Sequence, residues 1–243
     1  MLTLVGLGLF DERDLTLRGL EATKNADKVY IELYTGRWGG SVERLSKTIG
    51  KDIVELFRKD LEENSSKILD EAKNKKITIL VQGDPLVATT HNSLLLDARK
   101  KRIKTEIIHN ASIVSAIAET GLHIYKFGPS VTIPFPEKTK GKAPESIFEI
   151  IKANKKRGLH TLCLLDVVAE EDKYMTVTQG LRILSLDKMF AKDRLVVFSK
   201  AGSNTPSIFY DTVSNLIKKD IKDVPSVIII PGKLHFTEKE FLE

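Results

Sequence analysis

The sequence predicts an α/β protein with two domains. Short apolar runs typical of buried strands alternate with stretches in which apolar residues recur at helical spacing. The 243 residues are 42% apolar and 29% charged, which is the balance of a globular protein. No apolar run approaches the roughly 20 residues that a membrane-spanning helix needs. We therefore expect strand-helix-strand units and no membrane partner.

The first half of the chain alternates regularly between the two patterns. Apolar runs predict strands at 2–7, 28–33, 76–81 and 104–108, and amphipathic spacing predicts helices at 14–22, 41–49, 61–74 and 92–101. Basic blocks at 73–76, 99–102 and 155–157 each come just before a strand-like run. Cations there complement the end of a helix, and the alternative is a basic binding patch. The net charge of +5 favours an acidic partner without saying which.

A break in the pattern divides the chain near residues 109–115, which predicts domains at 1–110 and 111–243. A helical stretch runs from 109 to about 121, and prolines break the extended segment 128–136. The second half has helices predicted at 144–156 and 178–186 and strands at 160–165, 194–199 and 227–230. The polar segment 137–144 is predicted to be a mobile loop.

Two glycines follow the first strand directly. Gly6 and Gly8 would let a ligand or another backbone approach closely, as in nucleotide-binding turns. The third glycine of the dinucleotide fingerprint is missing, and Asp11 and Glu12 would repel a pyrophosphate. This argues against NAD or FAD and leaves a tight turn without ligand as the alternative.

Asp84 comes at the end of a predicted buried strand, where open α/β sheets bind ligands. Its carboxylate could accept hydrogen bonds from a ribose or an amine, or it could only cap the following helix. Thr89, Thr90 and His91 come next, but the chain has no Gly-x-Ser-x-Gly elbow, which argues against a hydrolase. The five histidines form no i, i+4 pair, and the one cysteine, Cys163, excludes both a disulfide within the chain and a cysteine-based zinc site. No metal site is expected.

Six segments carry a resemblance to a known family: 4–9, 82–91, 109–114, 125–135, 161–166 and 231–236. Gly-Asp-Pro at 83–85 alone is typical of the tetrapyrrole methylase superfamily. Its extension into Ala-Thr-Thr-His at 88–91, together with Gly-Pro-Ser-Val at 128–131, is similar to the diphthine synthase family in its archaeal form. The resemblance covers essentially the whole chain.

The resemblance implies a cytoplasmic methyltransferase that uses S-adenosyl-L-methionine and releases S-adenosyl-L-homocysteine. It implies two α/β domains with the cofactor in a cleft between them, and a homodimer. The substrate would be translation elongation factor two, methylated on the amino group of its 3-amino-3-carboxypropyl-histidine to give trimethylated diphthine. No nucleic acid is expected as partner. The alternatives are a methylase of corrin or porphyrin precursors, a methylase of ribosomal RNA, and a non-catalytic α/β binding protein. The sequence has no basic stripe interleaved with aromatic residues, which argues against the RNA methylase.

The resemblance also implies which positions contact the cofactor. These are Leu9, Asp84, Val87, Ser112, Ile113, Leu164, Leu165 and His235, with a further contact from the segment 201–207. The catalytic residue is not identified. His91, or a water held by Asp84, could accept the proton of the amine. The alternative is that His91 is only a hydrogen-bonding residue at a helix N-terminus.

Overall fold

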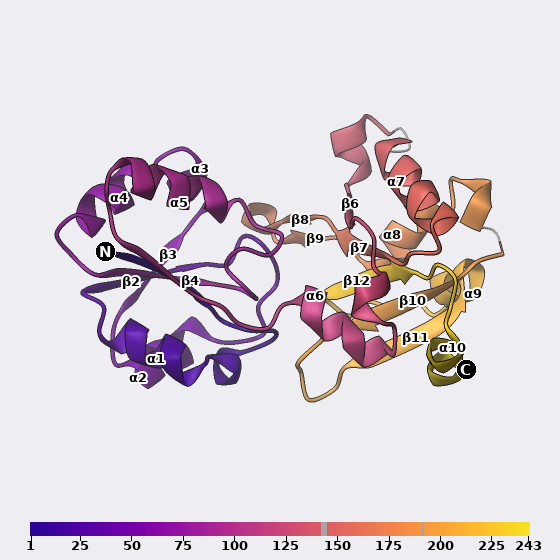
Figure 1. The fold of residues 1–243 in the computed structure, drawn as a ribbon, viewed down its shortest axis with the longest axis horizontal. Coiled ribbons are helices and arrows are strands. Elements are labelled where there is room, and N and C mark those ends of the chain that lie inside the picture. Colours follow the sequence, from indigo (N-terminus) through magenta and orange to yellow (C-terminus); the bar gives the residue numbers. More distant parts are fainter. Residues whose placement is uncertain (142–144, 191) are drawn as a thin grey trace. The chain divides into compact units, whose positions relative to one another are not determined.

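The computed structural model describes residues 1–141, 145–190 and 192–243. These residues divide into two compact units, Met1–Val114 and Ser115–Glu243, with the division inside the short helix α6 (Ile113–Ala116) (Figure 1). The predicted boundary, after residue 110, falls a few residues earlier. Both units contain strands and helices, which confirms the predicted α/β class with two domains.

The first unit is built on a five-stranded parallel sheet in the order β3-β2-β4-β1-β5. The strands are β1 (Leu2–Gly6), β2 (Lys28–Glu32), β3 (Ile53–Leu56), β4 (Ile77–Val81) and β5 (Thr105–Ile108). Helices α1 (Leu17–Lys24) and α2 (Val42–Ile49) cover one face, and α3 (Arg58–Glu62), α4 (Ser66–Ala72) and α5 (His91–Lys100) cover the other (Figure 1). Covered faces explain why the inner strands are almost continuously apolar.

The side chains of β2 point alternately to the two faces of the first sheet. Val29 and Ile31 pack with Leu45 and Ile49 of α2 in one apolar core. Because successive strand residues point to opposite faces, Glu32 lies on the face of α3 to α5. A buried carboxyl group is thereby placed at the carboxyl end of an inner strand.

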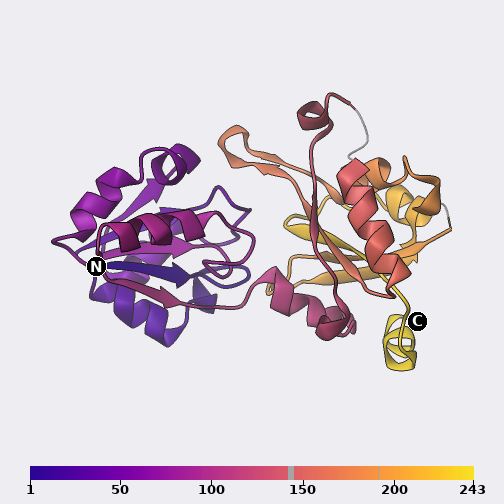
Figure 2. The same cartoon turned by 45° about the horizontal axis from the view of Figure 1, so that its top comes forward.

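The second unit contains a mixed five-stranded sheet in the order β11-β10-β12-β7-β6, in which only β6 and β7 are parallel neighbours. Its strands are β6 (Val131–Ile133), β7 (Thr161–Leu165), β10 (Arg194–Ser199), β11 (Ser207–Thr212) and β12 (Ser226–Ile230). Its α-helices are α7 (Glu145–Lys156), α8 (Val177–Leu184), α9 (Val213–Lys218) and α10 (Phe236–Leu242). The hairpin of β8 (Val167–Val168) and β9 (Lys173–Tyr174) protrudes from this unit (Figure 2).

Several elements differ from the sequence prediction. The helix predicted at 61–74 is two helices, α3 and α4, and strands β3 and β11 were not predicted. The stretch 109–121 is helical only from Ile113, and its second half is a 3-10 helix, Ile117–Thr120. The loop predicted at 137–144 begins inside a 3-10 helix, Pro136–Thr139, and residues 142–144 lie outside the described residues.

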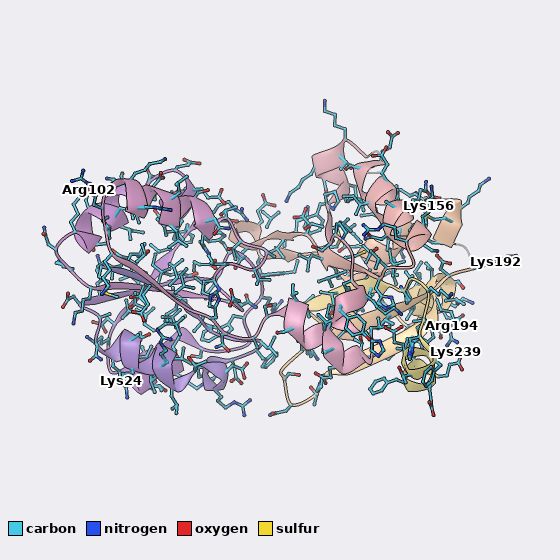
Figure 3. The ribbon with its side chains drawn as sticks, viewed as in Figure 1. Lys24, Arg102, Lys156, Lys192, Arg194 and Lys239 are labelled. Atoms are coloured by element: carbon cyan, nitrogen blue, oxygen red, sulfur yellow. The ribbon has the colours of Figure 1, made fainter. Side chains whose placement is uncertain are left out.

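The basic blocks lie at helix ends. Arg99 and Lys100 are in the last turn of α5, and Lys155 and Lys156 are in the last turn of α7. Figure 3 shows Arg102 and Lys156 with their side chains directed outward at these ends. The helix-end interpretation is confirmed. No helix in the described ranges is long and apolar enough to cross a membrane.

Candidate functional site

After two neighbouring strands of the first sheet, the chain passes to opposite faces of that sheet. β1 continues into α1 on one face, whereas its neighbour β4 continues into α5 on the opposite face (Figure 1). In open α/β sheets, ligands bind at the carboxyl ends of two such strands. The loops that follow β1 and β4 therefore form the candidate site.

These two loops are fixed to each other by their backbones. The N–H of Gly83 donates to the carbonyl of Gly8 at 2.9 Å, and the N–H of Gly8 donates to the carbonyl of Gly83 at 3.2 Å. Both residues have positive φ, +83° at Gly8 and +68° at Gly83, which favours glycine. A Cβ on Gly8 would lie 2.5 Å from Cβ of Asp14, so Gly8 has no room for a side chain.

Gly83 faces more open space than Gly8 does. A Cβ on Gly83 would have Cβ of Ser112 as its nearest neighbour, 3.8 Å away, which is an ordinary contact. A ligand can therefore approach the backbone at Gly83 from the side that Ser112 lines. The sequence predicted the glycine turn after β1 but not the bridge between Gly8 and Gly83.

Asp84 is buried and joins the loop after β4 to the loop after β5. Its Oδ1 accepts from the N–H of Leu86 at 3.0 Å, and its Oδ2 accepts from Nδ1 of His109 at 2.8 Å and from the N–H of Asn110 at 3.2 Å. Three donors thus hold a carboxylate that has about four acceptor positions. The structure assigns Asp84 a structural role within the site, with one acceptor position left for a ligand.

Asn110 completes the connection between the loops. Its Nδ2 donates to the carbonyls of Gly6 and Asp14, each at 2.9 Å. The loops after β1, β4 and β5 are therefore tied together by one amide and one carboxylate. Sequence reasoning missed the roles of His109 and Asn110, although both immediately follow a predicted strand.

Five of the positions implied by the resemblance lie in the first unit, four of them on these three loops and Ile113 at the start of α6, directly after the third loop. Leu9, Val87 and Ile113 are half-buried, whereas Asp84 and Ser112 are buried. Half-buried apolar side chains beside fixed polar groups are typical of a small-molecule site. The arrangement suits a ligand with both apolar and polar parts.

The remaining positions lie in the second unit. Leu164 and Leu165 end β7, and because strand side chains alternate, they point to opposite faces. Leu165 packs against the core of this unit, where its Cδ2 lies 2.7 Å from the position that a Cβ on Gly180 would occupy. Leu164 is thus the one of the two whose side chain points away from that core. The segment 201–207 runs through the turn between β10 and β11 and ends at the first residue of β11.

His235 is the N-cap of α10 and is exposed. Its Nδ1 lies 2.8 Å from the hydroxyl of Thr237, and its backbone N–H donates to Glu238 at 2.7 Å. Glu238 is fully buried and also binds Nε2 of His160 at 2.9 Å and Nζ of Lys126. Burial opposes the ionisation of Glu238, but the ammonium of Lys126 and the hydrogen bonds outweigh it and hold its pKa at about 2. This cluster attaches α10 to the unit.

His91 is buried at the first turn of α5. Its Nδ1 lies 3.0 Å from the carbonyl of Pro85, to which it donates, and burial lowers the pKa of the imidazole. A ring enclosed in this way does not meet a substrate amine. The structure therefore favours the alternative interpretation, in which His91 is a hydrogen-bonding residue at a helix N-terminus.

The described residues include no group of three or more histidine, cysteine or acidic side chains that could hold a metal ion. Cys163 is buried in β7, and burial raises the pKa of its thiol. A buried, protonated thiol is unreactive.

The family model for tetrapyrrole (corrin/porphyrin) methylases matches residues 1–217. Diphthine synthase of Methanococcus maripaludis is 42% identical over 251 residues, which cover 100% of this chain and 98% of the relative. Diphthine synthase of Methanocaldococcus jannaschii is 44% identical over 253 residues, with the same coverage. Sequence similarity of this extent includes both units.

Solved structures show the same similarity. A crystal structure of diphthine synthase superposes with a TM-score of 0.92 at 40% identity and covers 99% of this chain and 94% of that one. The structure of a conserved hypothetical protein from Aeropyrum pernix K1 gives a TM-score of 0.89 at 32% identity, covering 100% of this chain and 88% of that one. The fold described above is that of these proteins.

Proposed function

Because the chain belongs to the diphthine synthase family of tetrapyrrole methylases, and is thus an S-adenosylmethionine-dependent methyltransferase of diphthamide biosynthesis, we propose that its substrate is translation elongation factor two. It methylates the amino group of the 3-amino-3-carboxypropyl-histidine on that factor, and the end product is trimethylated diphthine. The observation that carries the proposal is the glycine-bridged pair of loops at the switch point of the first sheet, in a chain that diphthine synthases match along its whole length.

The residues of the candidate site suit S-adenosylmethionine. The open space in front of Gly83 accepts a ligand against the backbone, and Ser112 lies at the edge of that space. The half-buried side chains of Leu9, Val87 and Ile113 suit the adenine and the methionine chain. We propose that these residues, with Asp84, form the contacts of the first unit, and that Leu164, Leu165 and His235 form those of the second.

Methyl transfer to an amine mainly requires that the amine be positioned against the methyl group and that water be excluded from the site. When bound, S-adenosylmethionine supplies a methyl group on a positively charged sulfur. The task of the protein is to hold a neutral amine in line with that methyl group, about 3 Å away, and to exclude water. The loops after β1, β4 and β5 suit this task because Asp84 and Asn110 fix them to one another. The apolar side chains on those loops exclude water.

The proposal is tested by transfer of a labelled methyl group. The acceptors are elongation factor two that carries the 3-amino-3-carboxypropyl group, the same factor without that group, and a tetrapyrrole precursor. We expect label only on the first, with mass spectrometry showing addition of three methyl groups. Methylation of the tetrapyrrole in place of the protein would support the alternative function and overturn the proposed substrate.

We propose further that the protein works as a homodimer in the cytoplasm, as the family resemblance implies. Light scattering at a series of concentrations tests the dimer, and a molecular mass that stays at 27.2 kDa would contradict it.

A further inference from the structure

His109 is an exposed imidazole held by a buried carboxylate at the candidate site. It directly follows β5, and 66% of its side chain is exposed, whereas the side chain of Asp84 is 8% exposed. The distance from Nδ1 of His109 to Oδ2 of Asp84 is 2.8 Å. No sequence motif assigns a role to this pair.

The contact fixes which nitrogen of the ring carries the proton. An ionised carboxylate only accepts hydrogen bonds, so Nδ1 of His109 is the donor and the neutral ring has its free lone pair on Nε2. Asp84 cannot turn away easily, because the N–H groups of Leu86 and Asn110 hold its two oxygens. The ring is therefore oriented as a base with its accepting nitrogen directed away from Asp84.

Other charged groups near His109 are engaged elsewhere. Glu106, on the same strand, pairs with Arg18 at 2.8 Å. The carboxylate of Asp14, on the loop after β1, accepts from the N–H of Phe10 at 2.7 Å. Asp84 is thus the acidic group that contacts the ring, and it lies directly after Gly83, where the backbone is open to a ligand.

A proton acceptor is needed in the proposed reaction. An alkyl amine is an ammonium ion at neutral pH, and an ammonium has no lone pair with which to attack the methyl group. The proton must leave before each transfer. His91, which the sequence suggested for this step, is enclosed behind Pro85.

We propose that His109 is the proton acceptor of the methyl transfer and that Asp84 is the residue that positions it. Nε2 takes the proton from the substrate ammonium, and the freed lone pair on nitrogen forms the new N–C bond while the C–S bond breaks and its electron pair stays on sulfur. The imidazolium then releases its proton to solvent. The inference rests on the proposed function and names the catalytic residue of that same site.

The first test compares His109→Asn with the wild-type protein in single-turnover methyl transfer to the modified elongation factor over a range of pH. We expect a loss of about 100-fold or more near neutral pH, because a positioned base contributes at least that much. The difference in rate between His109→Asn and the wild-type protein becomes smaller as pH rises, because more of the amine is already deprotonated. Cofactor affinity, measured by calorimetry, stays within about twofold. Lys104→Asn, at the exposed position just before β5, is the control and keeps the wild-type rate.

The second test needs neither substrate nor cofactor. Nitrogen-15 NMR of the histidine side chains should show the neutral ring of His109 protonated on Nδ1, and Asp84→Ala, which removes the acceptor, should abolish that preference. His109→Gln is a second variant for the methyl-transfer assay of the first test. Circular dichroism confirms that each variant is folded.

The outcomes separate the two proposals. A wild-type protein that binds no S-adenosylmethionine overturns the proposed function and this inference with it. A wild-type protein that methylates, together with His109 variants that transfer at its rate or with a ring protonated on Nε2, overturns the inference alone.

Discussion

Glu32 is a carboxyl group with no exposed surface at the end of β2. Burial raises its pKa from 4.5 to about 7, although a hydrogen bond from the hydroxyl of Thr35, at 2.9 Å, partly opposes the shift. Nε2 of His91 lies 3.9 Å from its Oε1, too far for a direct hydrogen bond. Near neutral pH this side chain is thus close to half-ionised.

The raised pKa of Glu32 makes stability depend on pH. Between pH 4.5 and about 7 the folded protein keeps a proton that the unfolded chain releases, so the free energy of unfolding falls as pH rises through this window. The fall amounts to at most about 3 kcal/mol, at about 1.36 kcal/mol per pH unit. Glu32→Gln should remove this dependence, whereas Glu55→Gln, on the exposed part of β3, should keep it. Urea unfolding at several pH values measures both, and parallel curves for wild type and Glu32→Gln would refute the assignment.

Alanine substitutions at Gly83 and Gly50 distinguish two effects of an added methyl group: strain in the backbone and loss of space for the ligand. Both have positive φ, +68° and +74°, and a Cβ at Gly50 would meet nothing within 4 Å. Alanine at either position should cost about 1 kcal/mol of stability. Only Gly83→Ala should also weaken binding of S-adenosylmethionine, by about tenfold or more, because its methyl group enters the candidate site. Equal affinities in the two variants would show that the ligand does not approach Gly83.

At the scale of elements, the buried carboxylate of Glu238 attaches α10. Glu238→Ala leaves the ammonium of Lys126 and the backbone N–H groups of His123 and His235 without their acceptor. Removing one partner of a buried ion pair costs about 3 kcal/mol. Hydrogen exchange should show α10 unprotected in Glu238→Ala, with Glu240→Ala, on the exposed side of the same helix, as the control. Unchanged protection would mean that apolar contacts hold the helix.

Most of the strands that could be predicted are inner strands, whose residues are buried on both faces of the sheet. The edge strand β5 was also predicted, because it ends in the apolar pair Ile107 and Ile108. β1, β4, β7, β10 and β12 are apolar runs, and all were predicted from that pattern alone. β3 and β11 were missed because each is an edge strand with exposed positions and therefore no apolar run. The helix predicted at 61–74 ignored Asn64 and Ser65, which compete with the backbone for hydrogen bonds and interrupt it.

The candidate site was predictable only in part, for a related reason. Asp84 could be placed at a carboxyl strand end because the strand before it is visible in the sequence. Its pairing with His109 and Asn110 depends on β5 lying beside β1, which no local pattern encodes. Glycine turns are readable, but the bridge between Gly8 and Gly83 requires knowledge of the strand order.

For the whole molecule, the net charge of +5 is distributed over helix ends and ion pairs. Lys101 pairs with Asp70 at 3.0 Å and Lys155 with Asp193 at 2.5 Å. Lys126 is bound to buried Glu238. At these positions the positive charges form ion pairs within the protein.

A bulky side chain at a position proposed to contact the cofactor should block its binding. Val87→Trp in the first unit and Leu164→Trp in the second should each lower affinity for S-adenosylmethionine by about tenfold or more, because their half-buried side chains leave no room for an indole. Leu96→Trp, at an exposed position on α5, is the control and should bind normally. Normal binding by a folded Leu164→Trp variant would exclude that part of the second unit from the site.

The position of β1 inside the sheet has a consequence for synthesis of the chain. β1 leaves the ribosome before the rest of its sheet, yet its two neighbours are β4 and β5, and its Leu2 pairs with Ile77 on one side and Thr105 on the other. About a hundred further residues must therefore be synthesised before both edges of this apolar strand can be paired. Contacts so distant in sequence form slowly and leave strand edges open to association. The nascent first unit is thus expected to need a chaperone until β5 has emerged.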